Sequence, residues 1–141
     1  MKKILKIQIL FLIFVFSSCT QKKLSGSEKV GEIEKTIPKA DIAELETEIN
    51  NGGFNQYFIN SSGQNCYETL KTLKKNGKLK TAKLLEKAII LINPNKISEK
   101  VFIEKLSKNE VDELYNEKIS VELEKLDAEF YKYLDGNLTE K

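Results

Sequence analysis

An apolar stripe in residues 79–92 constrains the fold more strongly than any other part of the sequence. The segment reads LKTAKLLEKAIILI, and its apolar residues recur every three or four positions, which is the spacing of one helix face. The stripe stops at Asn93-Pro94, where proline disfavours continuation of a helix. Because this apolar face is wide, we expect the segment to be the central helix of a bundle. Its predicted inward-facing residues are Leu79, Ala82, Leu85, Ala88, Ile89 and Ile92.

Two further helices are predicted before this segment. Asp41 followed by Glu44 matches a capping box, and apolar residues then recur on one face, so a first helix is expected from about residue 42 to 51. A second helix, in QNCYETLKTLKK, ends at Asn76-Gly77, where glycine can adopt the left-handed conformation that closes a helix. Cys66 lies on the apolar face of this helix, and we interpret it as a small core residue.

Helical spacing continues after Pro94. Ser98 is the predicted N-cap of a short helix and Asn109 that of the next, and one helix or two, broken near Ser120, would then run up to Gly136. The residues predicted to face inward here are Val101, Phe102, Leu106, Val111, Leu114, Tyr115, Ile119, Leu123, Leu126, Phe130 and Tyr133. No stretch shows convincing alternation with period two, so the predicted fold class is all-α, with about five to six helices in a single small domain.

The first nineteen residues resemble the signal peptide of a bacterial lipoprotein. Three lysines precede an apolar run at residues 7–16, which is shorter than the roughly 20 residues of a membrane-spanning helix. Two serines and Cys19 follow, and VFSSC resembles the lipobox in which the cysteine is acylated. We therefore expect a signal peptide at residues 1–18, lipidation of Cys19, and a flexible tether at residues 19–40. An uncleaved membrane helix and a plain secreted protein are the alternatives.

Two adjacent glycines, three aromatic rings and several amides crowd the stretch from Asn50 to Gly63. The glycines permit backbone conformations or close approaches that a Cβ would block, and the aromatic residues have the spacing of one helical face. We favour a buried corner between two helices, with amides satisfying free backbone groups, and keep a binding cleft as the alternative. The residues of this predicted corner are Asn51, Gly52, Gly53, Phe54, Gln56, Tyr57, Phe58 and Asn60.

Three segments carry a resemblance to a known family: EINNGGFNQYFINSSG, KKNGKLKTAKLLEKAI and LEKLDAEFYKY. With Asn-Gly-Gly-Phe in the first and Asp-x-x-Phe-Tyr in the last, they resemble the DNA-mimic protein domain family over roughly residues 41–135. The resemblance implies a helical domain, here at residues 41–136 before a C-terminal tail at 137–141, and a namesake proposed to present acids in place of DNA phosphates. Such mimicry needs a strongly negative surface, whereas removal of residues 1–18 lowers the net charge only from +2 to −1. We therefore carry over the fold and not the mimicry.

Charge is segregated along the chain. Residues 70–97 hold eight lysines and one glutamate, whereas residues 99–141 hold twelve acids and seven lysines. One surface of the domain is thus expected to be basic and another acidic. The predicted basic contact face is Lys71, Lys74, Lys75 and Lys78, and the predicted acidic contact face is Asp112, Glu113, Glu117, Glu124 and Asp127.

The chain contains no histidine and no arginine. Zinc sites of the histidine type, Ser-His nucleophiles and imidazole acid–base catalysis are therefore excluded, and we expect no enzyme activity, cofactor or metal. The lack of arginine removes the bidentate contacts favoured in specific nucleic-acid recognition, so nucleic acid is not an expected partner.

The sequence thus predicts a lipid-anchored protein of the cell membrane or outer membrane, outside the cytoplasm, that binds an unknown envelope protein through its charged helical faces. One alternative is an immunity-type lipoprotein that neutralises an envelope toxin. Another is a small-ligand carrier that uses the Gly-Gly-aromatic corner. The opposite charges of the two faces also leave self-association open.

Overall fold

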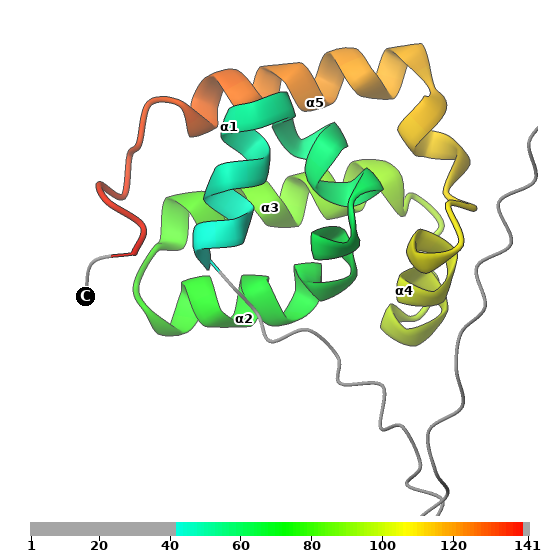
Figure 1. Ribbon diagram of the computed structural model, residues 1–141, viewed down its shortest axis with the longest axis horizontal. Helices are drawn as coiled ribbons and strands as arrows, with labels where there is room; N and C mark the ends of the chain where they lie inside the picture. The colour runs from blue at the N-terminus through cyan, green and yellow to red at the C-terminus, as the bar shows by residue number, and fades with distance from the viewer. Residues whose placement is uncertain (1–41, 140–141) are drawn as a thin grey trace, which may run out of the picture. The chain divides into compact units, whose positions relative to one another are not determined.

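The computed structural model describes residues 42–139, whose regular elements are all helices, and this confirms the predicted all-α class (Figure 1). The α-helices of this part are α1 (Ile42–Ile59), α2 (Cys66–Lys75), α3 (Leu79–Ile92), α4 (Glu99–Ser107) and α5 (Glu117–Phe130), with 3₁₀ turns η1 (Ser61–Asn65) and η2 (Asp112–Tyr115). The predicted signal peptide, Cys19, the tether and the capping residue Asp41 lie outside the described residues.

Helix α3 is central in the described domain, as its apolar stripe predicts. It packs against both α2 and α5, while α1 packs against α5, η1 and α2, and α4 packs against η1. In Figure 1, α5 runs along the top and α2 along the bottom of the domain, with α4 at the side. The core is formed by side chains from all five helices, among them Leu45, Phe58, Leu85, Phe102 and Leu123, each at most 1% exposed.

Most of the predicted inward-facing positions are buried or half-buried, but four are exposed. Leu79 is 61% exposed because no neighbouring helix covers this first residue of α3, and Val101 is 44% exposed on the outer side of α4. Tyr115, at the end of η2, is 64% exposed, and Tyr133 lies beyond the end of α5 with a positive φ of 46°. These four residues stand at or near element ends or on the rim of a stripe, where helical spacing alone does not decide burial.

Gly77 closes α2 as predicted. Its φ is +73°, and the backbone N–H of Lys78 donates to the carbonyl of Leu73 at 2.9 Å, which completes a Schellman motif. Ser98 occupies the N-cap position of α4, but its side chain makes no capping hydrogen bond there.

The prediction that Asn109 begins a helix is wrong. Asn109 has a φ of +55° and closes α4 in the same way as Gly77 closes α2, with the N–H of Glu110 donating to the carbonyl of Lys105 at 2.9 Å. The cap of the last helix is Asn116, whose Oδ1 accepts from the N–H of Lys118 at 3.0 Å. α5 therefore begins at Glu117, is not broken near Ser120, and stops six residues before Gly136.

Candidate functional site

The two glycines of the predicted corner break α1 into two helical segments. Gly52 has φ −169° and ψ 23°, and Gly53 has φ +76° and ψ −176°, so neither continues the helix. The conformation of Gly53 is one that residues with a Cβ rarely adopt. The backbone thus turns where the sequence predicts a corner, and the second segment begins at Phe54.

Helix α5 supplies the groups that satisfy the two ends of this break. Asp127 Oδ1 accepts from the backbone N–H of Phe54 at 2.8 Å, and the Tyr131 hydroxyl donates to the carbonyl of Ile49 at 2.8 Å. The Phe54 and Phe130 rings meet edge to face with centroids 6.1 Å apart. We call Asp127, Phe130 and Tyr131 the α5 clamp. The clamp explains why Asn-Gly-Gly-Phe and Asp-x-x-Phe-Tyr occur together, since the second motif caps the break that the first creates.

Gly53 is required by the clamp as well as by the turn. A Cβ at this position would lie 2.2 Å from Asp127 Oδ2. Partial burial raises the pKa of the Asp127 carboxyl, an effect that the Phe54 N–H opposes and the nearby Glu124 charge reinforces. Asp127 was predicted for the acidic contact face, but the structure places it half-buried in this corner, where it accepts from the backbone of α1.

The amides of the corner mostly bind other parts of the domain. Gln56 Nε2 and Asn60 Nδ2 both donate to Glu48 Oε2, at 3.1 and 2.6 Å, and Asn50 Nδ2 donates to the Tyr133 hydroxyl at 2.8 Å. The aromatic residues Phe54, Tyr57 and Phe58 are all at most 1% exposed. Asn51 is exposed, and its side chain forms no hydrogen bond with other residues of the described domain. The geometry is that of a structural corner, because its aromatic rings are buried and most of its amides bind other parts of the domain.

Cys66 is fully buried, as the sequence predicts. Burial raises the pKa of its thiol to about 12, so the thiolate needed for nucleophilic chemistry is scarce at neutral pH. Next to it, both side-chain polar atoms of Asn65 are buried and form no hydrogen bond with other described residues.

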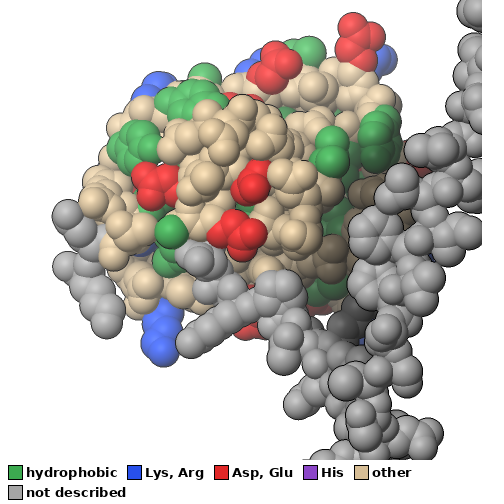
Figure 2. Space-filling model, viewed as in Figure 1, with side chains coloured by type: hydrophobic (Ala, Val, Ile, Leu, Met, Phe, Trp, Pro, Cys, Tyr) green, Lys and Arg blue, Asp and Glu red, His purple; other side chains and the backbone are tan. Residues whose placement is uncertain are grey.

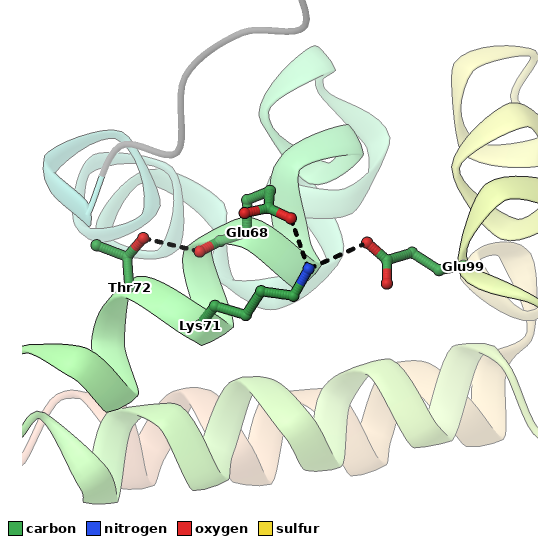
Figure 3. Close-up of polar contacts among 4 residues, drawn as sticks. All are labelled: Glu68, Lys71, Thr72 and Glu99. Atoms are coloured by element: carbon green, nitrogen blue, oxygen red, sulfur yellow. Dashed lines mark hydrogen bonds and ion pairs between the residues drawn. The ribbon is translucent and has the colours of Figure 1, made fainter.

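Two of the four lysines in the predicted basic contact face are neutralised by acids. Lys71 lies 2.6 Å from Glu68 and 3.8 Å from Glu99 of α4, which ties α2 to α4 (Figure 3). The hydrogen bond that Lys71 donates to the Glu68 carboxylate is the main cause of the raised pKa of Lys71. Lys74 lies 3.0 Å from Glu86 of α3.

The other lysines of α2 and α3 divide into those that hold the C-terminal segment and those that face solvent. Lys78 Nζ donates to the carbonyl of Asn137, and this hydrogen bond holds the C-terminal segment against the domain. Lys75, Lys83 and Lys87 are exposed, and none of the three forms an ion pair within residues 42–139. We call these three the unpaired lysines.

The acids of the predicted acidic contact face are only partly available. Asp112, Glu117 and Glu124 are exposed, while Glu113 is half-buried. Acidic side chains also occupy the middle of the face shown in Figure 2, the face on which α1 lies. α1 carries Glu44, Glu46 and Glu48, which the sequence-based acidic face did not include.

A further site at the C-terminal end was missed by sequence reasoning. Asp135 Oδ2 accepts from the backbone N–H of Thr81 at 2.6 Å, and so caps the start of α3 from a distant part of the chain. Lys80 Nζ donates to the carbonyl of Leu134 at 3.3 Å, and Leu138 is 2% exposed in the core. The segment from residue 137, predicted as a tail, therefore begins as part of the packed domain.

No helix among residues 42–139 combines the length and apolar character needed to cross a membrane. The same residues hold no cluster of three or more His, Cys, Asp or Glu side chains that could bind a metal ion.

Comparisons with known proteins support the resemblance seen in the sequence. The family described as DMP19-like protein matches residues 40–140, which include every described helix. Searches of curated proteins and of solved structures gave no match. The family match covers well over half of the chain and includes both the Gly-Gly break and the α5 clamp. The chain therefore belongs to the DMP19-like protein family.

Proposed function

We propose that this protein is a lipid-anchored envelope protein whose helical domain is a non-catalytic module for binding a protein partner. The observation that carries the proposal is the set of unpaired lysines. Lys75, Lys83 and Lys87 leave positive charge uncompensated on α2 and α3, while the neighbouring Lys71 and Lys74 are held by acids. Uncompensated charge of one sign steers and orients a partner of the opposite sign.

Two further features support a binding role over a catalytic or carrier role. In the corner, the Phe54 N–H and the amides of Gln56 and Asn60 already form hydrogen bonds with Asp127 and Glu48, so few polar groups are left to bind a ligand. The Cys66 thiol is buried, and the sequence has no histidine to activate it. The lipobox-like VFSSC supports a position at a membrane surface, where a tether of about twenty residues would give the module reach.

The test is affinity purification of the full chain from crosslinked native envelopes, beside two charge variants. The first reverses the unpaired lysines (Lys75→Glu, Lys83→Glu, Lys87→Glu). The matched control reverses Lys100, Lys105 and Lys118, which are exposed on α4 and α5 and change the net charge equally. Lys74 and Lys78 are left intact because their contacts hold the fold together.

We expect the same partner to be recovered by the wild type and the control but lost from the first variant. Loss of the partner from both variants would mean that net charge alone decides binding. Recovery of the partner by all three proteins would show that the contact does not involve the unpaired lysines. Recovery of no partner by the wild type would count against an interaction module. An immunity-type lipoprotein is the narrower form of the proposal, and it predicts that deletion of the gene makes cells more sensitive to neighbouring strains.

A further inference from the structure

The exposed surface of α3 carries an isoleucine between two open grooves. Ile90 is 55% exposed and lines both grooves. One groove, of about 290 Å³, lies between α2 and α3 and is lined by the apolar side chains of Tyr67, Leu70 and Ile97 among others. The other, of about 310 Å³, lies between α3 and α5 and includes Leu91 and Leu126.

The form of these grooves suits side chains of a partner polypeptide. Their volumes are at the lower limit of the roughly 300–1,000 Å³ that small-molecule sites occupy, and both are open to solvent. Two open grooves on either side of an exposed isoleucine suit the spaced apolar residues of an amphipathic helix, which docks in a groove through anchors three and four positions apart. A flat membrane surface would leave the grooves empty.

The charges around Ile90 favour a partner surface of negative charge. Two acids line the grooves, but Glu86 is paired with Lys74 at 3.0 Å and Glu122 with Lys125 at 2.5 Å. The remaining charged lining residues are Lys87 and Lys96, and neither forms an ion pair with another residue of the described domain. The rim is therefore positive wherever it is not already neutralised.

We propose that the surface formed by Ile90, its two flanking grooves and the rim lysines Lys87 and Lys96 docks an acidic amphipathic helix of a partner protein. Apolar side chains of that helix fill the grooves beside Ile90, and its carboxylates face the two lysines. This inference rests on the proposed function, because it assigns a surface and a partner chemistry to the same interaction module.

The test measures binding of synthetic helical peptides to the purified full chain by fluorescence anisotropy. The first peptide has leucines three and four positions apart and glutamates on its other face. A second replaces the glutamates with lysines, and a third replaces the leucines with serines. Vesicles rich in phosphatidylglycerol form a separate arm, because the same lysines and Ile90 could also meet an anionic membrane.

We expect the first peptide to bind and the other two to bind at least about tenfold more weakly. Ile90→Asp should raise the Kd of the first peptide about tenfold, and Lys87→Glu should raise it several-fold and reduce its dependence on salt. Val101→Asp is the matched control, since Val101 is 44% exposed on α4 and lines neither groove; it should leave the Kd unchanged. Thermal unfolding should be the same for all variants, because each changed side chain is exposed.

The inference is overturned if the acidic peptide does not bind, if the lysine peptide binds equally well, or if Ile90→Asp and Val101→Asp have equal effects. Binding of vesicles, but not of the peptide, through Ile90 would replace the partner helix by a membrane surface. Capture of an envelope partner that is insensitive to Ile90→Asp would leave the proposed function standing and refute only this surface.

Discussion

Replacing Gly53 with alanine should destabilise the domain more than replacing Gly77, although φ is positive at both glycines, +76° and +73°. A Cβ on Gly77 would have nothing within 4 Å, so its cost is the about 1–2 kcal/mol of placing an L-residue in the left-handed conformation. At Gly53, ψ is −176°, which belongs to a region restricted almost entirely to glycine and costs on the order of 1–3 kcal/mol.

The larger difference comes from Asp127. A Cβ on Gly53 would approach Asp127 Oδ2 to 2.2 Å and displace the carboxylate that accepts from the Phe54 N–H. Leaving that N–H without its acceptor costs about 1–3 kcal/mol. We therefore expect Gly53→Ala to cost about 2 kcal/mol more than Gly77→Ala, which corresponds to a Tm lower by about 10 °C in a domain of this size.

Urea unfolding followed by far-UV circular dichroism measures these free energies, with Asp127→Ala and the Gly53→Ala/Asp127→Ala double variant completing a cycle. When Asp127 is already absent, Gly53→Ala should cost only the backbone strain, so the two changes should be less than additive. Equal losses at Gly53 and Gly77, or strict additivity of the two changes, would refute the reasoning from the clamp.

Two further changes test the interior. Burial raises the pKa of Asp127 above its ordinary value of 3.8, so the folded state disfavours the carboxylate at neutral pH, and this penalty disappears as the pH falls through the raised pKa. Asp127→Asn should therefore be at least as stable as the wild type at neutral pH, with an advantage that shrinks towards about pH 4 in urea unfolding; an advantage that grows on acidification would contradict the sign. Leu138→Ala should lower the free energy of unfolding by about 2 kcal/mol, the lower end for a buried leucine, because a site near the chain end can partly collapse. Leu134→Ala, at a residue 50% exposed, should change it by less than about 0.5 kcal/mol, and equal effects would show that Leu138 is not part of the core.

Local patterns in the sequence were sufficient to predict where α2, α3 and α4 lie in the chain and which residues form most of the core. The spacing of Ala82, Leu85 and Ile89 predicted their burial in α3, and Asn76-Gly77 predicted the end of α2. The same reasoning failed for Asn109, because asparagine is favoured both at an N-cap and in the left-handed conformation that closes a helix. Only the hydrogen bonds distinguish the two roles.

The contacts of the corner could not be predicted in the same way. Asn-Gly-Gly-Phe indicated a turn between helices, but nothing local shows that Asp127 and Tyr131 satisfy its free backbone groups. An aspartate on α5 has the same local signature whether it faces solvent or caps a helix seventy residues away, so Asp127 was assigned to the acidic surface. Asp135 was missed for the same reason. The signal that could have found the clamp is the co-occurrence of the two motifs in the family resemblance.

The two long-range caps, formed by Asp127 and Asp135, come after most of the domain in the order of the chain. Asp127, Tyr131 and Asp135 follow the first four helices in the chain, and they satisfy backbone groups at the Gly-Gly break of α1 and at the start of α3. During synthesis from the N-terminus, the break in α1 and the start of α3 therefore stay uncapped until these residues emerge. A chain still held on the ribosome would keep these helix ends uncapped, and the domain would close in one late step.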